Sequence, residues 1–123
     1  MTAASLEPSP SELVTFDVTA AGSSVHVRAA GEIDSSSAPA LRTELTAVLD
    51  LAPAEIVLDL CGVTFLDSAG LSVLAAAHRR ATADDVRLRV LVSGRAVVRP
   101  LQITGLWQLL DAELVQADGD SDG

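Results

Sequence analysis

A run of small and polar residues, Asp67-Ser68-Ala69-Gly70, lies where a predicted strand passes into a predicted helix. The hydroxyl of Ser68 can accept a phosphoryl group, and Ala69 and Gly70 present almost no side chain, so another protein's active site can approach it closely. A phosphate on Ser68 would meet the free N–H groups and the favourable dipole of a helix N-terminus. The commonest use of Asp or Ser at such a position is to cap the helix. The residue types alone therefore leave two interpretations of Ser68 open, a modification site and a helix cap.

A serine hydrolase also places its nucleophile on a strand-to-helix turn, but the spacing argues against one. Leu66 occupies the position of the first glycine in a G-x-S-x-G turn. His78 lies ten residues further along the same predicted helix, about 15 Å away by helical rise, and His26 is expected on the outer face of a strand. No general base can be placed beside Ser68, so we expect no enzymatic activity.

The remaining reactive side chains indicate structural roles. A hydrogen bond within a loop is the favoured role for Thr64, ahead of a second phosphorylation site, and Cys61 is expected to be a small buried apolar residue rather than a redox sensor. Two histidines and one cysteine at unrelated positions predict no zinc site. The sequence has no glycine-rich phosphate loop, so nucleotide binding by this chain alone is weakly motivated, and no cofactor is expected.

The elements that must position these residues follow from hydrophobic periodicity and from turn and cap signals. Ser37 is the expected cap of the first helix, Gly62 is expected to turn the chain after the central strand, and Pro100 is expected to bend or interrupt the third helix. The pattern leaves a last strand at 112–115 undecided. The predicted elements are a hairpin over 14–19 and 25–29, helices at about 38–51, 68–81 and 94–104, and strands at 55–60 and 86–92.

The order strand, helix, strand, helix, strand predicts parallel pairing of at least three strands by right-handed crossovers. Together with the hairpin, this gives a mixed sheet. The strand alternation places His26, Arg28, Arg87 and Arg89 on the face away from the helices, where a second helix layer would bury charge at high cost. We therefore predict an α/β fold, a two-layer sandwich with helices on one face of the sheet.

Length and charge limit the class of protein. The 123 residues carry 17 acids, 8 arginines and no lysine, for a net charge of −9. This fits one domain over residues 13–116, between a flexible tail at 1–12 and an acidic flexible tail at 117–123. The acidic balance argues against nucleic acid as a partner. The apolar runs are too short to cross a membrane, and Arg28 is the first basic residue, so no secretory signal is expected and the cytoplasm is the expected location.

The segment Val63 to Leu71 (VTFLDSAGL), together with Gly31-Glu32-Ile33-Asp34, resembles the STAS-domain family of anti-sigma factor antagonists. The resemblance extends from about Val14 to Val115 and includes Thr104-Gly105-Leu106. It implies a STAS-like fold and a partner-switching function, in which the unphosphorylated antagonist binds an anti-sigma factor with serine kinase activity and frees a sigma factor. Phosphorylation by that kinase reverses the switch, and a serine phosphatase resets it.

The resemblance also assigns roles to individual residues. Ser68 corresponds to the phosphorylated serine, and Ala69 stands where many members have a second serine. The partner-binding residues implied are Glu32, Asp34, Thr64, Asp67, Ser68, Ala69 and Gly70. The alternative is a STAS module that does not switch, such as a scaffold, a nucleotide-responsive domain or a soluble partner of a transport complex.

Overall fold

The computed structural model of the protein describes residues 14–115. The two predicted tails, 1–12 and 117–123, lie outside these residues. The strands are β1 (Val14–Ala21), β2 (Ser24–Ile33), β3 (Glu55–Leu66), β4 (Arg87–Val92) and β5 (Glu113–Leu114). The helices are α1 (Ala38–Asp50), α2 (Ser68–Ala83), α3 (Arg95–Thr104) and α4 (Leu106–Leu109).

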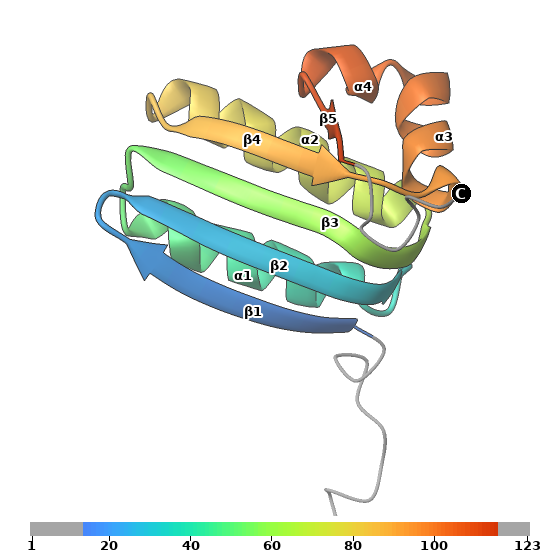
Figure 1. Ribbon diagram of the computed structural model, residues 1–123, viewed down its shortest axis with the longest axis horizontal. Coiled ribbons are helices and arrows are strands. Elements are labelled where there is room, and N and C mark those ends of the chain that lie inside the picture. The colour runs from blue at the N-terminus through green and yellow to red at the C-terminus, as the bar shows by residue number, and fades with distance from the viewer. Residues whose placement is uncertain (1–13, 116–123) are drawn as a thin grey trace, which may run out of the picture.

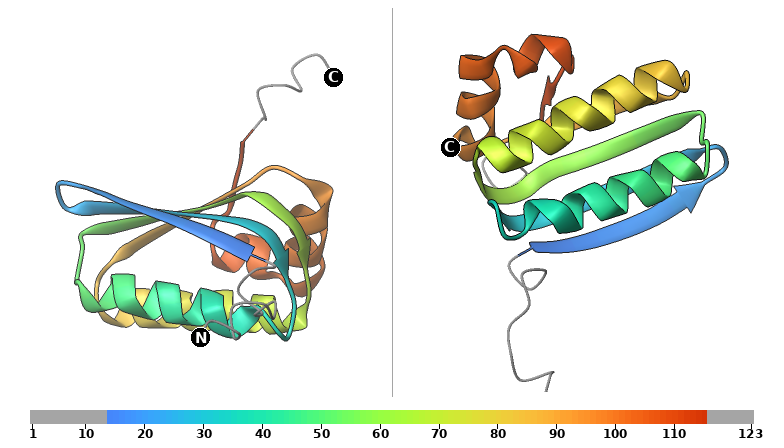
Figure 2. Two further views of the ribbon diagram at one scale, coloured as in Figure 1. Left: turned by 90° about the horizontal axis from the view of Figure 1, so that it is seen from below. Right: turned by 180° about the vertical axis from the view of Figure 1, so that it is seen from behind.

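The five strands form one mixed sheet in the order β1-β2-β3-β4-β5, which confirms the predicted α/β fold class (Figure 1). β1 is antiparallel to β2 through a tight turn at Gly22 and Ser23, and the other neighbours are parallel. Gly22 has a φ of +64°, a conformation that glycine adopts at no steric cost. All helices lie on one side of the sheet (Figure 2), so the two-layer arrangement is also confirmed.

The core fills the space between the sheet and α1 and α2. On α1 the buried side chains recur every three or four residues, which turns one apolar face toward the sheet. On β2 the alternate residues Val25, Val27 and Ala29 are buried and face the helices. Because β2, β3 and β4 run parallel, their carboxyl ends lie at the same edge of the sheet. Helix α2 begins at this edge.

The predicted end of β3 at Leu60 and the turn at Gly62 are wrong, because the strand continues to Leu66. Its pairing with β2 shifts register twice in this stretch. A Cβ atom on Gly62 would lie 2.9 Å from the Cβ of Ala30, so glycine here allows two strands to approach closely. A glycine inside a strand often marks such an irregularity and not a turn.

The C-terminal third of the domain also differs from the prediction. α3 runs through Pro100 without interruption. Pro100 has no amide hydrogen to donate to the carbonyl of Ala96, so the helix continues past this position with one hydrogen bond fewer. The single-turn helix α4 was not predicted, and β5, left undecided by the pattern, forms a two-residue strand beside β4.

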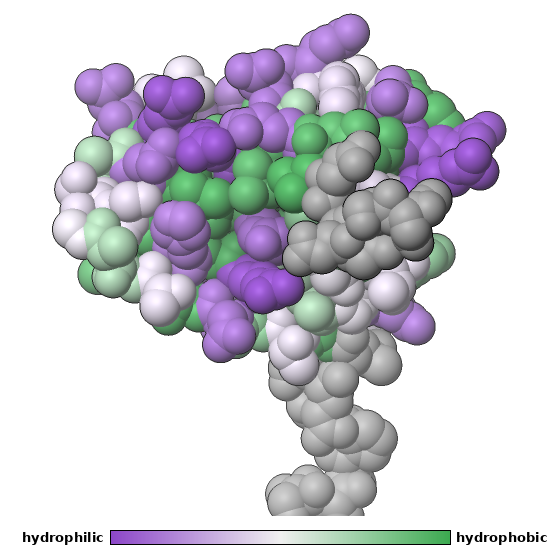
Figure 3. All heavy atoms as spheres, viewed as in Figure 1, coloured by the Kyte–Doolittle hydropathy of each residue, from purple (hydrophilic) through white to green (hydrophobic). Residues whose placement is uncertain are grey.

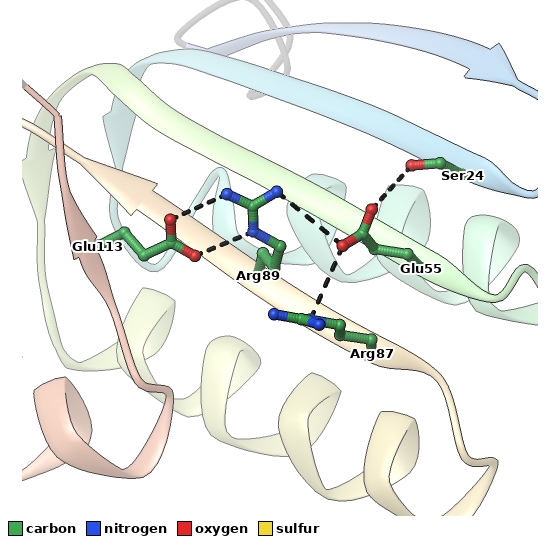
Figure 4. Close-up of polar contacts among 5 residues, drawn as sticks. All are labelled: Ser24, Glu55, Arg87, Arg89 and Glu113. Carbon is green, nitrogen blue, oxygen red and sulfur yellow. Dashed lines mark hydrogen bonds and ion pairs between the residues drawn. The ribbon is translucent and has the colours of Figure 1, made fainter.

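Arg87 and Arg89 lie on the face of the sheet away from the helices, as predicted, and form a network of ion pairs there (Figure 4). Arg89 donates from Nε and Nη2 to the carboxylate of Glu113 over 3.0 and 2.9 Å. Arg87 and Arg89 also approach Glu55 to 3.8 and 3.9 Å. Figure 3 shows apolar atoms between the polar side chains on this face. The network ties β5 to the neighbouring strands.

The Arg89–Glu113 pair predicts how the attachment of β5 depends on pH. The hydrogen bonds from Arg89 and the positive charge of its guanidinium lower the pKa of Glu113. A lowered folded pKa means that the pair stabilises β5 above the unfolded pKa of glutamate, near 4.3, and loses this effect as the pH falls through the folded pKa. We expect Glu113→Gln to reduce the exchange protection of the Val115 amide, which donates to Val92, about two- to fivefold at pH 7.

Glu44→Gln on α1 is the matched control and should leave this protection unchanged. The difference between wild type and Glu113→Gln should disappear at pH values at which Glu113 is protonated. Equal protection in the two proteins at pH 7, measured by amide exchange with NMR detection, would contradict the role given to the ion pair.

Candidate functional site

The ends of β2 and β3 lie side by side and bring the predicted site residues together. Ile33 is the register partner of Leu66, and Glu32 is the partner of Phe65. Beyond the ladder, the amide of Asp67 donates to the carbonyl of Ile33 over 3.1 Å. The acidic loop after β2 therefore lies next to the first turn of α2.

Asp67 begins α2 as its N-cap. One carboxylate oxygen, Oδ1, accepts hydrogen bonds from the amides of Ala69 and Gly70, at 2.9 and 3.4 Å. Its own carbonyl accepts from the amide of Leu71 at 3.0 Å. Aspartate is among the preferred N-cap residues because its carboxylate satisfies amides that have no partner inside the helix.

Ser68 is the first residue of α2, and its side chain is exposed. Its hydroxyl makes no hydrogen bond to any group of residues 14–115. The expectation that a phosphate on Ser68 would find several free amides needs correction, because Asp67 already accepts from those of Ala69 and Gly70. The helix dipole still favours a negative charge at this position. Asp67 thus caps the helix, and the neighbouring Ser68 exposes its hydroxyl.

Gly70 and Ala69 let the first turn of α2 pack closely. Gly70 is buried, and a Cβ atom there would collide with Leu66 and lie 2.7 Å from Cγ2 of Ile33. Ala69 is half-buried and lines a groove between α1 and α2 together with Arg42 and other side chains. Gly70 therefore contributes to the site through its packing below the surface, whereas the side chain of Ala69 forms part of the surface itself.

The loop after β2 is held by its own polar groups. The carboxylate of Asp34 accepts from the amide and hydroxyl of Ser36 at 2.9 and 2.7 Å, and these bonds lower the pKa of Asp34. The carbonyl of Asp34 accepts from the amide of Ala38 at 2.8 Å. Asp34 therefore shapes the loop, and the side chain of Glu32, which is exposed, makes no hydrogen bond or ion pair within residues 14–115.

Ser37 differs from its predicted role as a capping side chain. It occupies the N-cap position of α1, but its side chain makes no capping bond. The residue is fully buried, and its hydroxyl donates to the carbonyl of Glu32 at 2.7 Å and accepts from the amide of Asp34 at 3.0 Å. A buried hydroxyl must find partners, and Ser37 finds them in the loop that precedes the helix.

Thr64 and Phe65 complete the surface around Ser68. Thr64 is exposed and donates to the carbonyl of Gly31 at 3.3 Å, which is the kind of structural bond expected for it. Phe65 is 47% exposed although it lies in a strand. The sequence analysis did not single out Phe65, because the predicted strand ended at Leu60 and left Phe65 outside the sheet.

The other reactive side chains lie apart from this surface. Cys61 was predicted to be buried, but it is half-buried in the structure. Burial raises the pKa of its thiol. His26 is exposed on β2 and His78 follows Ser68 by ten residues on α2. Within residues 14–115 no three potential metal ligands gather, and no helix is long and apolar enough to span a membrane.

The division of roles between Asp67 and Ser68 predicts different costs of substitution. Asp67→Ala removes the N-cap and should lower the free energy of unfolding by about 1 kcal/mol. Ser68→Ala removes an exposed hydroxyl that has no hydrogen-bond partner among the described residues, and should change the free energy of unfolding by less than about 0.5 kcal/mol. Chemical denaturation followed by circular dichroism measures both values. A cost for Ser68→Ala equal to that for Asp67→Ala would mean that Ser68 is itself the cap.

Comparisons with known proteins agree on one family. The family described as "Mlab, STAS domain" matches residues 16–115. The anti-sigma-F factor antagonist RsfB of Mycobacterium tuberculosis is 37% identical over 76 residues, 62% of each chain, so the chain spans about three fifths of that relative's length. The anti-sigma-B factor antagonist of Bacillus subtilis is 30% identical over 98 residues, 80% of this chain and 89% of that protein.

A solved structure agrees with both sequence relatives. The crystal structure of an anti-sigma factor antagonist from Mycobacterium paratuberculosis superposes with a TM-score of 0.77 at 33% identity. The superposition covers 86% of this chain and 90% of that one. The structural similarity therefore extends over most of the chain.

Proposed function

We infer the function from one premise, that the chain belongs to the STAS domain family. We propose that it is an anti-sigma factor antagonist, whose unphosphorylated form binds an anti-sigma factor with serine kinase activity and thereby releases a sigma factor. Two relatives and one structural neighbour with 30–37% identity carry the name of anti-sigma factor antagonist, which supports this proposal. Because sigma factors act on RNA polymerase, we place the chain in the cytoplasm.

The observation that carries the proposal is the exposed hydroxyl of Ser68 at the start of α2, which forms no hydrogen bond with any group of residues 14–115. Asp67 supplies the cap, so the helix does not need this hydroxyl. A kinase can engage Ser68 without first breaking a hydrogen bond within the part of the chain that the structure describes. Among the hydroxyls of the site, Thr64 donates to a carbonyl and Ser37 is buried, which makes Ser68 the favoured acceptor.

We propose that the partner binds a surface formed by Glu32, Asp34, Thr64, Asp67, Ser68, Ala69 and Gly70, extended by Phe65. Glu32 offers a carboxylate that no described residue engages, and Phe65 offers an exposed aromatic ring next to it. Aromatic side chains are frequent energetic centres of protein interfaces. Asp34, Asp67 and Gly70 contribute by fixing the loop and the helix start that present these groups.

Phosphorylation would act through charge. The kinase transfers the terminal phosphoryl group of ATP to Oγ of Ser68, the hydroxyl proton passes to a base of the kinase, and ADP leaves. The product carries about −1.5 to −2 of added charge beside the carboxylate of Asp67. An interface that places apolar or acidic groups opposite Ser68 then loses affinity by desolvation and repulsion. A serine phosphatase restores the hydroxyl, and the chain itself needs no refolding and no cofactor.

Binding of the anti-sigma kinase encoded in the same genome tests this function. Ser68→Ala should bind the kinase like the unphosphorylated wild type, measured by calorimetry in the presence of ADP. Ser68→Asp should bind at least about tenfold more weakly, because a charge is left without a partner in the interface.

Ser72 supplies the matched control, because it is exposed on α2 one helical turn after Ser68. Ser72→Asp introduces the same charge on the same helix and should weaken binding much less than Ser68→Asp. Equal affinities of Ser68→Ala and Ser68→Asp would remove Ser68 as the switch and favour a STAS module that does not switch.

A further inference from the structure

The charges of the C-terminal part of the chain are sorted into two adjacent blocks. The segment Val86–Leu110 contains no Asp or Glu and four arginines, in a chain whose net charge is −9. The following residues, 111–123, contain five acids and no Arg or Lys. Neighbouring blocks of opposite charge attract each other whenever the fold lets them meet.

Some of these opposite charges already form ion pairs in the fold. Glu113 of the acidic block forms a two-bond ion pair with Arg89 of the basic block (Figure 4). Arg87 approaches Glu55. The two arginines that remain, Arg95 and Arg99, are both exposed on α3, and no carboxylate of residues 14–115 lies within ion-pair distance of either.

These two arginines share one face of α3. Residues four apart on a helix lie on the same side, about 6 Å apart along the axis. Ile103 lies four residues after Arg99 on the same side of the helix and is 74% exposed. This side of the helix is slightly hollowed between Arg95, Val98, Arg99, Gln102 and Ile103. We refer to these five residues as the α3 face. It combines two cations without a described acidic partner and an uncovered apolar end.

The acidic block leaves the sheet beside the start of α3. β5 runs parallel to β4, and the amide of Val115 donates to the carbonyl of Val92 at 2.7 Å. Arg95 lies three positions after Val92, and Asp118 lies three positions after Val115. Three residues span at most about 10 Å, so the segment that follows Val115 can reach Arg95 without displacing any strand.

We propose that the acidic segment Asp118–Asp122 binds the α3 face. Its aspartates, Asp118, Asp120 and Asp122, alternate with small residues. In an extended chain alternate residues point to the same side and lie about 6.6 Å apart, which matches the separation of Arg95 and Arg99 along the helix. A short connection also gives the segment a high effective concentration at this face.

The outer face of the sheet is a less favourable place for the segment. Its arginines are interleaved with carboxylates, since Arg28 lies near Asp17 and Asp59 in one hollow and Arg89 is paired with Glu113. The α3 face has no acid in its own helix. An acidic protein that approaches α3 must therefore displace the segment. This inference does not depend on the proposed function, because the segment and its site belong to one chain.

A nitroxide spin label on the segment tests the proposal in the isolated protein. The label is attached to Ser121→Cys in a Cys61→Ser background, and broadening of backbone amide signals is recorded by NMR at low ionic strength. We expect loss of signal intensity at the amides of Arg95, Arg99 and Ile103. Salt near 1 M should restore the signals, because the screening length falls to about 3 Å.

Two sets of substitutions identify the charges involved. Asp118, Asp120 and Asp122 changed together to Asn should abolish the broadening, and so should Arg95→Gln with Arg99→Gln. Arg28→Gln with Arg42→Gln is the matched control, because it removes two exposed arginines elsewhere and should leave the broadening intact. The aspartate variant leaves α3 unchanged, so it remains informative if the arginine variant does not fold.

Three results would overturn the proposal. The first is the absence of broadening on α3 at low ionic strength. The second is broadening on α3 that persists in the aspartate variant, which would indicate a contact without charge pairing. The third is broadening centred on Arg28 or Arg87, which would place the segment on the outer face of the sheet.

Discussion

The hydrogen bonds of Asp67 fix the start of α2, and the arrangement of the site depends on them. Its amide donates to the carbonyl of Ile33, its carbonyl accepts from Leu71, and its carboxylate accepts from the amides of Ala69 and Gly70. One residue thereby joins the end of β2, the end of β3 and the first turn of α2. Because the cap is supplied by Asp67, α2 does not need the hydroxyl of Ser68, which we propose as the site of phosphorylation.

The surroundings make this arrangement rigid. Gly70 allows α2 to rest directly on Ile33 and Leu66, where any side chain would collide. The buried hydroxyl of Ser37 and the carboxylate of Asp34 hold the neighbouring loop with bonds of 2.7–3.4 Å. A site fixed in this way can change its affinity through a single added charge, because the charge meets a preformed surface and not a flexible loop.

Much of the fold was accessible from the sequence, because the alternation in β2 and the periodicity of α1 report burial directly. The start of α2 at Ser68 also followed from local sequence signals, and the grouping of Glu32 with Asp67 and Ser68 was implied by the family resemblance. The errors at Gly62 and Ser37 have one cause: glycine and serine act through neighbours that are distant in sequence or through the preceding loop, and local pattern does not report these. The exposure of Phe65 is likewise a tertiary property, set by the extension of β3 beyond β4.

The most direct test of the account is to locate the phosphoryl group after the purified protein is incubated with ATP, magnesium and serine kinases from the same genome. Mass mapping of peptides should find one added phosphoryl group, on Ser68, and none in Ser68→Ala. A phosphoryl group found on Thr64 or Ser72 while Ser68 stays unmodified would contradict the central claim that the cap formed by Asp67 leaves Ser68 as the group through which this protein is switched.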